Sequence, residues 1–207
     1  MDSHRTETRS GSTYAKLSLA ALLLVAVASD ASNQRAASQQ NSTPAPKAGD
    51  EIKPRGEREV KEITYGDWQK LCFKPGGSKM LCRTSITGTF TTGQIAVRVD
   101  IVEREGDATA RLQVFSPVGM YLPKPVKFTV DQGEPYLVPY TWCLTNACIA
   151  GTPATPKMVQ EMSSAEMLRL EFVDSNLLSL TTSLPLGQFA SIHKGPPAQT
   201  FEQDIDE

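Results

Sequence analysis

The sequence predicts an all-β protein whose folded domain is an antiparallel β-sandwich with one short helix, preceded by a signal peptide and a disordered tether. Apolar residues recur at every second position through much of residues 62–193, the spacing that sends alternate side chains to opposite faces of a sheet. Turns rich in Gly, Pro and Asn separate these short segments. No strand is followed by the long helix that a parallel crossover needs, so the predicted pairing is antiparallel.

Residues 1–28 have the features of a secretory signal peptide. Basic residues up to Lys16 precede an uncharged run of 12 residues from Leu17 to Ala28, which is short of the roughly 20 residues that span a bilayer. The run ends in the small-x-small pattern Ala26-Val27-Ala28. We therefore expect export with cleavage near Ala28 and no transmembrane span in the mature chain. The expected location is the periplasm, the outer membrane or the outside of the cell.

Residues 29–61 and 194–207 are predicted to be disordered, the first as a linker and the second as an acidic tail. In the linker, Ile52 and Val60 are the only large aliphatic residues, and three prolines interrupt it. Its apolar surface is too small to offset an ordering entropy of about 1–2 kcal/mol per residue. The tail contains two prolines and ends in acidic residues. The sandwich is therefore expected at residues 62–193, enough chain for one packed core.

Five segments show the alternation of strands that bury one face. They are, in chain order, residues 95–101 (IAVRVDI), 110–114 (ARLQV), 126–130 (VKFTV), 168–172 (LRLEF) and 178–184 (LSLTTSL). The turn residues Asp174-Ser175-Asn176 separate the last two segments, which favours an antiparallel pair. Residues 156–166 are the one predicted helix, with Thr155 as the N-cap and Pro156 at the first helical position.

The four cysteines, Cys72, Cys82, Cys143 and Cys148, are predicted to form two local disulfides. Four cysteines allow three pairings, and the sequence alone does not choose among them. A hairpin centred at Gly77 would set Cys72 opposite Cys82, and the second pair would close a four-residue loop. The alternative is a zinc site, but neither spacing is the two-residue knuckle of such sites and no histidine accompanies them.

Trp68 is predicted to be a structural core residue. The same hairpin register sets Trp68 opposite Ile86, on the face that carries Cys72. We therefore expect the indole to pack over the first disulfide in the core rather than to bind a ligand.

Tyr136, Tyr140 and Trp142 come shortly before Cys143. Tyr and Trp combine a large rigid surface with a polar tip, so these three residues are a candidate recognition surface. The alternative, which we favour, is that they pack around the second disulfide.

Charge and histidine content argue against several functional classes. The chain has 21 Lys+Arg against 23 Asp+Glu and a formal net charge of −2, so no positive excess favours nucleic-acid binding. The two histidines are His4 and His193, and we expect His193 at the surface. A Ser-His-Asp relay or a histidine-rich zinc site is therefore not expected, and no motif for a cofactor or metal occurs.

Two carboxylate pairs could in principle serve as a general acid and a general base. They are Asp100 with Glu103 and Glu171 with Asp174. On strands with one apolar face these acids would point outward, where charges are normally solvated. We therefore predict no catalytic residues.

A series of short motifs spans about residues 64–192. They are YGDW at 65–68 followed by Cys72 and Cys82, SPVGMYLP at 116–123, Val130-Asp131, and CLTNAC at 143–148. Together they resemble the invasion-associated locus B family, whose members are exported by alphaproteobacteria. Ala147 stands where that family typically has Gly.

The resemblance implies an immunoglobulin-like sandwich in the periplasm or at the outer membrane, in a family named for host-cell invasion and without an established catalytic motif. We therefore expect a non-enzymatic exported envelope or binding protein whose partner is another protein or an envelope component, with no cofactor. The alternatives are an envelope-polymer hydrolase that uses carboxylates and a periplasmic stress or chaperone-like factor.

The signal peptide gives the first testable prediction. Cleavage is expected after Ala28, because Ala26 and Ala28 fit the small −3 and −1 pockets of signal peptidase. N-terminal sequencing of the protein from the envelope fraction is expected to begin at Ser29, or a few residues later. A chain that still begins at Met1 would contradict export by this route.

Overall fold

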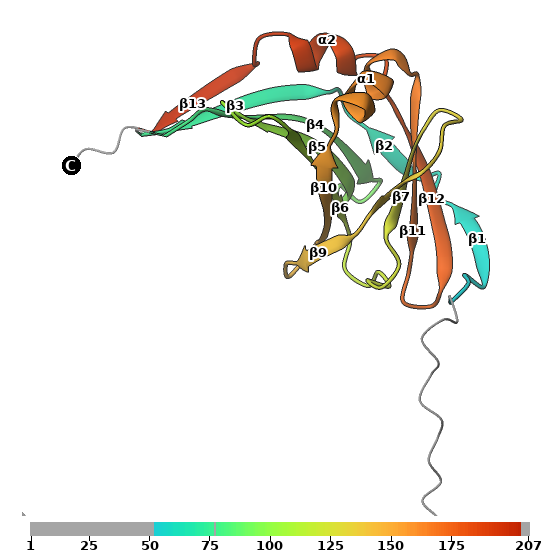
Figure 1. The fold of residues 1–207 in the computed structure, drawn as a ribbon. Helices are drawn as coiled ribbons and strands as arrows, with labels where there is room; N and C mark the ends of the chain where they lie inside the picture. The colour runs from blue at the N-terminus through green and yellow to red at the C-terminus, as the bar shows by residue number, and fades with distance from the viewer. Residues whose placement is uncertain (1–51, 77, 204–207) are drawn as a thin grey trace, which may run out of the picture. The chain divides into compact units, whose positions relative to one another are not determined.

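The computed structural model describes residues 52–76 and 78–203, and these residues form two β-sheets that pack face to face (Figure 1). The predicted signal peptide and most of the predicted linker lie outside the described residues. The smaller sheet has the order β1 (Gly56–Glu59), β12 (Leu178–Pro185), β11 (Met167–Val173), β7 (Val126–Val130), β8 (Tyr136–Val138). The sandwich prediction is confirmed.

The larger sheet has eight strands. Its order is β13 (Gln199–Gln203), β3 (Gln69–Pro75), β4 (Leu81–Phe90), β5 (Ile95–Arg104), β6 (Ala110–Ser116), β10 (Cys148–Ala154), β9 (Tyr140–Cys143), and β2 (Ile63–Tyr65) also pairs with β4. Pairing is antiparallel except at two edges, where β1 lies parallel to β12 and β13 lies parallel to β3. The antiparallel prediction therefore holds for the interior of both sheets.

The core fills the space between the sheets with the alternating apolar residues that the sequence indicates. They include Val97, Val99, Ile101, Leu112, Val114, Val126, Phe128, Leu168, Leu170 and Leu184. Ile95 is an exception, with 56% of its surface exposed. The register between β4 and β5 shifts at Gly88/Thr89, so that Thr89 pairs with Ile95 and Ala96 is skipped. This bulge interrupts the alternation and turns Ile95 away from the core.

Two helices lie together at one end of the sandwich (Figure 1). Helix α1 (Pro156–Ser164) begins as predicted, because Thr155 Oγ1 accepts a hydrogen bond from Met158 N at 3.2 Å. Its buried residues, Met158 and Met162, close this end of the core. Helix α2 (Phe189–Lys194) was not predicted, so the expectation of a single helix is wrong. None of the helices in the described residues is long and apolar enough to cross a membrane.

Strands β1 and β13 lie in segments predicted to be disordered, and this part of the prediction is wrong. Both strands add to a sheet edge by backbone hydrogen bonds. Val60 N donates to Thr181 O at 2.8 Å beside β1, and Ala198 N donates to Lys70 O at 2.8 Å beside β13. All of β1 is exposed, so it forms without burying apolar side chains. The disorder prediction was based on the scarcity of apolar residues and therefore could not detect these strands.

The β3–β4 hairpin has the predicted register. Cys72 pairs with Cys82 and Gln69 with Ser85. If this register continues by one position, Trp68 lies opposite Ile86, as predicted. The structure joins Cys72 to Cys82 and Cys143 to Cys148, so the local pairing is confirmed over the two alternatives.

Trp68 is buried in the core, with 3% of its surface exposed, but its neighbours differ from the prediction. Its ring packs edge-on against Phe189 with the centroids 4.9 Å apart. Its indole Nε1 donates to Pro185 O at 2.8 Å. The sequence prediction did not include the contact with Phe189, because it placed no helix at Phe189–Lys194.

Truncation of Trp68 tests its structural role. Trp68→Ala is expected to lower the free energy of unfolding by roughly 3–5 kcal/mol, because a fully packed ring is lost and a cavity remains. The measurement is the urea midpoint with both disulfides intact. Trp142→Ala is the matched control, since Trp142 is 60% exposed and its loss is expected to leave the midpoint nearly unchanged. Equal midpoints for the two variants would contradict a structural role for Trp68.

Candidate functional site

The three candidate recognition aromatics do not share one environment. Tyr136 and Tyr140 are half-buried and pack against the core cluster. The Tyr136 hydroxyl donates to Glu161 Oε2 at 2.6 Å. That hydrogen bond, with burial and the Glu161 charge, raises the pKa of Tyr136 to about 12. Burial also raises the pKa of Tyr140. Both tyrosines therefore pack against the core cluster, and packing around the second disulfide stays a prediction.

Trp142 differs from the two tyrosines because its ring faces solvent. It lies in β9, which pairs with β10 on one side only. The hairpin between these strands is closed by the Cys143–Cys148 disulfide and by Leu144 N donating to Ala147 O at 2.6 Å. Leu144 in the turn is 54% exposed. The second disulfide therefore fixes a short hairpin that presents two large apolar side chains, those of Trp142 and Leu144, to solvent.

A groove of about 720 Å³ lies beside this hairpin. Leu144 lines it together with Ile95 and Val118, which are 56% and 50% exposed. Arg98 and Phe115 also line the groove, and the Arg98 guanidinium lies 3.7 Å from the centroid of the Phe115 ring. Exposed apolar side chains from three separate segments thus meet at one place. This groove could not be predicted from the sequence, because the bulge that exposes Ile95 has no clear sequence signature.

Asp100 lies under the arginines of this sheet and is 1% exposed, so the expectation that it points into solvent is wrong. Arg98 Nε donates to Asp100 Oδ2 at 3.2 Å. Burial raises the pKa of Asp100, while the charges of Arg98 and Arg83 oppose that shift. The flanking arginine side chains cover the carboxylate, which the sequence could not reveal before the strand register was known.

Neither of the two predicted acid pairs faces a common site. Glu103 lies three residues from Asp100 on β5, so the two carboxylates point to opposite faces of the sheet. Lys127 Nζ donates to Glu171 Oε1 at 2.9 Å. Asp174 Oδ1 accepts hydrogen bonds from the backbone of the turn that follows it. These arrangements give no pair of carboxylates facing a common substrate position.

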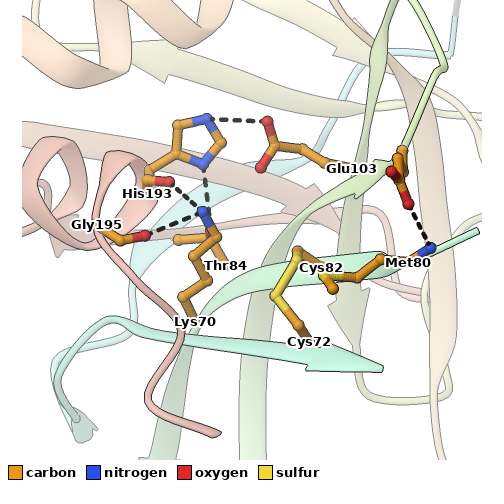
Figure 2. Close-up of a disulfide and its surroundings, with 9 residues drawn as sticks. Lys70, Cys72, Met80, Cys82, Thr84, Glu103, His193 and Gly195 are labelled. Carbon is orange, nitrogen blue, oxygen red and sulfur yellow. Dashed lines mark hydrogen bonds and ion pairs between the residues drawn. A yellow bond between two sulfur atoms is a disulfide. The ribbon is translucent and has the colours of Figure 1, made fainter. Parts of the chain in front are cut away.

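His193 is buried, and the expectation of a surface position is wrong. Its ring stacks on Phe189 with the centroids 5.0 Å apart and an interplanar angle of 13°. The burial follows from α2, which spaces Phe189 and His193 four residues apart on the same face of the helix. The prediction missed the helix and therefore missed the burial. Figure 2 shows the imidazole between Thr84 and Glu103 beside the first disulfide.

The His193 imidazole lies between a hydroxyl, that of Thr84, and a carboxylate, that of Glu103. This is the arrangement of a hydroxyl–imidazole–carboxylate relay. His193 Nδ1 lies 3.2 Å from Thr84 Oγ1, and His193 Nε2 lies 3.7 Å from Glu103 Oε1. Thr84 is fully buried, so no substrate reaches its hydroxyl, and a nucleophilic role is excluded. Lys70 Nζ donates to the backbone oxygens of His193 and Gly195 (Figure 2). The cluster therefore fixes α2 to β3 and β4.

No three His, Cys, Asp or Glu side chains in the described ranges come close enough to hold a metal ion. The fold and this site define a disulfide-linked β-sandwich that presents an apolar hairpin and groove to solvent.

Comparison with known proteins identifies the family. The family model described as invasion associated locus B (IalB) protein matches residues 68–197, and the chain belongs to this family. The crystal structure of invasion associated protein B from Bartonella henselae is similar, with a TM-score of 0.55 and 20% sequence identity over 62% of this chain and 88% of that chain. That likeness supports the shared fold. No curated protein matches the chain.

Protonation of His193 is expected to destabilise the fold. Burial lowers the pKa of His193 below its ordinary value, although Glu103 partly opposes the shift. A histidine with a lowered pKa in the folded state contributes stability above its unfolded pKa of about 6.5, and this contribution is lost as the pH falls through the folded pKa.

The measurement compares urea midpoints at about pH 7.5 and about pH 5, on either side of the ordinary histidine pKa. The wild-type midpoint is expected to fall more between these two conditions than the midpoint of His193→Gln, whose side chain is neutral at both. An equal fall in the two proteins would assign the pH dependence to other groups.

Proposed function

We propose that the protein is a non-enzymatic exported protein of the bacterial envelope that binds a partner macromolecule through the β9–β10 hairpin. Membership of the invasion associated locus B family supports the general class. The Bartonella protein with the similar fold is named for invasion. We extend that role to this chain as a contribution to contact with a host cell or with another envelope component.

One observation carries the proposal. Trp142 and Leu144 are 60% and 54% exposed, and the disulfide that flanks them fixes their hairpin. Exposed clusters of large apolar side chains are uncommon on monomeric proteins and usually mark interaction sites. Trp is also among the residues that contribute most to binding when a partner covers it. A rigid hairpin loses little conformational entropy on binding, which favours this role.

The proposed location rests on the sequence and on the cysteines. Both disulfides join cysteines within the described residues, and such bonds form and persist in oxidising compartments such as the periplasm. The predicted signal peptide at residues 1–28 supports export of the sandwich from the cytoplasm.

The proposal predicts a specific contact at Trp142. A photoreactive phenylalanine analogue at position 142, in the full-length protein expressed in its own cells, is expected to form one discrete crosslinked species. The same analogue at Lys61 is the control, because the Lys61 side chain is 79% exposed and lies outside the hairpin.

Equal crosslinking at both positions, or none at Trp142, would contradict the proposed surface. Hydrolysis of purified cell-wall fragments by the protein, abolished by changing Glu103 or Glu171, would favour the hydrolase alternative instead.

A further inference from the structure

The outer face of the eight-stranded sheet carries a concentration of arginine. The registers of β4, β5 and β6 place Arg83, Arg98, Arg104 and Arg111 on the face opposite the core. We call these four residues the arginine face. Among the strand residues described on this face, Asp100 is the single carboxylate. The face therefore has an excess of positive charge, although the whole chain has a formal net charge of −2.

The centre of this face is held in a fixed arrangement. Asp100 is buried and accepts from Arg98 Nε, which sets the Arg98 guanidinium over the Phe115 ring. The Arg111 guanidinium lies beside Gly151 on the neighbouring strand. Because the Asp100 hydrogen bond and the Phe115 ring orient the Arg98 guanidinium before any partner arrives, a carboxylate could form paired hydrogen bonds with it at a low entropy cost.

The apolar groove opens at the end of the arginine face. Arg98 and Phe115 belong to both, while Ile95, Val118 and Leu144 form the exposed apolar wall. A single partner segment could therefore place an apolar side chain in the groove and acidic side chains on the arginines. Such a combination of apolar anchor and complementary charge gives both affinity and orientation.

We propose, on the basis of the binding function proposed above, that the arginine face and its groove dock an acidic segment of a partner protein that carries large apolar side chains. The composition favours a protein partner, because arginine and aromatic residues are enriched in protein interfaces whereas lysine is depleted. The described strands place no lysine on this face. A second copy docked through the same face would set arginine against arginine, so like charges oppose that arrangement.

The test uses the mature protein and two fluorescein-labelled decapeptides of alternating residues, one of Glu and Leu and one of Lys and Leu. Fluorescence anisotropy is expected to show binding of the acidic peptide and not of the basic one. Arg111→Glu and, separately, Leu144→Ser are each expected to weaken binding at least about tenfold, as for residues central to an interface. Added salt is expected to weaken the Arg111-dependent part.

Arg169→Glu is the matched control, because Arg169 is an arginine with 52% side-chain exposure in the smaller sheet. It is expected to bind the acidic peptide as the wild type does, and urea midpoints of all variants check that they are folded. Unchanged binding by Arg111→Glu and Leu144→Ser would overturn the proposal. Binding to phosphatidylglycerol vesicles without binding to the acidic peptide would also overturn it, in favour of a membrane surface.

The outcome separates this inference from the function on which it rests. If the analogue at position 142 still crosslinks in cells while Arg111→Glu changes nothing, the arginine face is wrong and the binding function stands. If neither crosslinking nor peptide binding is found, both proposals fail.

Discussion

The aromatic stack of Trp68, Phe189 and His193 is the contact on which the arrangement of the domain depends. It joins the start of the β3–β4 hairpin to helix α2, which follows β12. Trp68 also donates a hydrogen bond to Pro185 O, 117 positions away in the sequence. Thr84 of β4 and Lys70 of β3 also form hydrogen bonds with His193 of this helix. Helix α2 thereby sets where the chain enters β13. Long-range contacts of this kind cost loop-closure entropy, and a large buried ring is suited to offset it.

The two faces of the eight-stranded sheet differ in composition. One face is buried against the smaller sheet and carries the alternating aliphatic residues of β5 and β6. The other face carries arginines, Phe115 and a carboxylate that is almost completely covered. Burying Asp100 is unfavourable for its charged form, and its Oδ1 has no hydrogen-bond partner among the described residues. The charges of Arg98 and Arg83 oppose this cost, and the hydrogen bond from Arg98 Nε orients the Arg98 guanidinium in return.

Much of the fold could be predicted from the sequence because period-two alternation is a direct consequence of burying one face of a strand. The hairpin register that pairs Cys72 with Cys82 follows from the same geometry. Helix α2 was missed because a six-residue helix carries little periodic signal, although Phe189 and His193 at a spacing of four were an available clue. Strand β13 was missed because backbone pairing, not apolar burial, holds it. The groove depends on a bulge at Ala96 and on residues from three segments, and only the tertiary structure brings them together.

The parallel pairing of β13 with β3 has a consequence for an exported chain. If the protein crosses the membrane from its N-terminus, β3 and β4 reach the far side long before residues 199–203 do. Until then the outer edge of β3 has unpaired backbone groups, which can pair with the edge of another molecule. Because this edge of the sheet is completed only by residues 199–203, a chain truncated before Gln199 would be a candidate for edge-to-edge aggregation even though its core residues are all present.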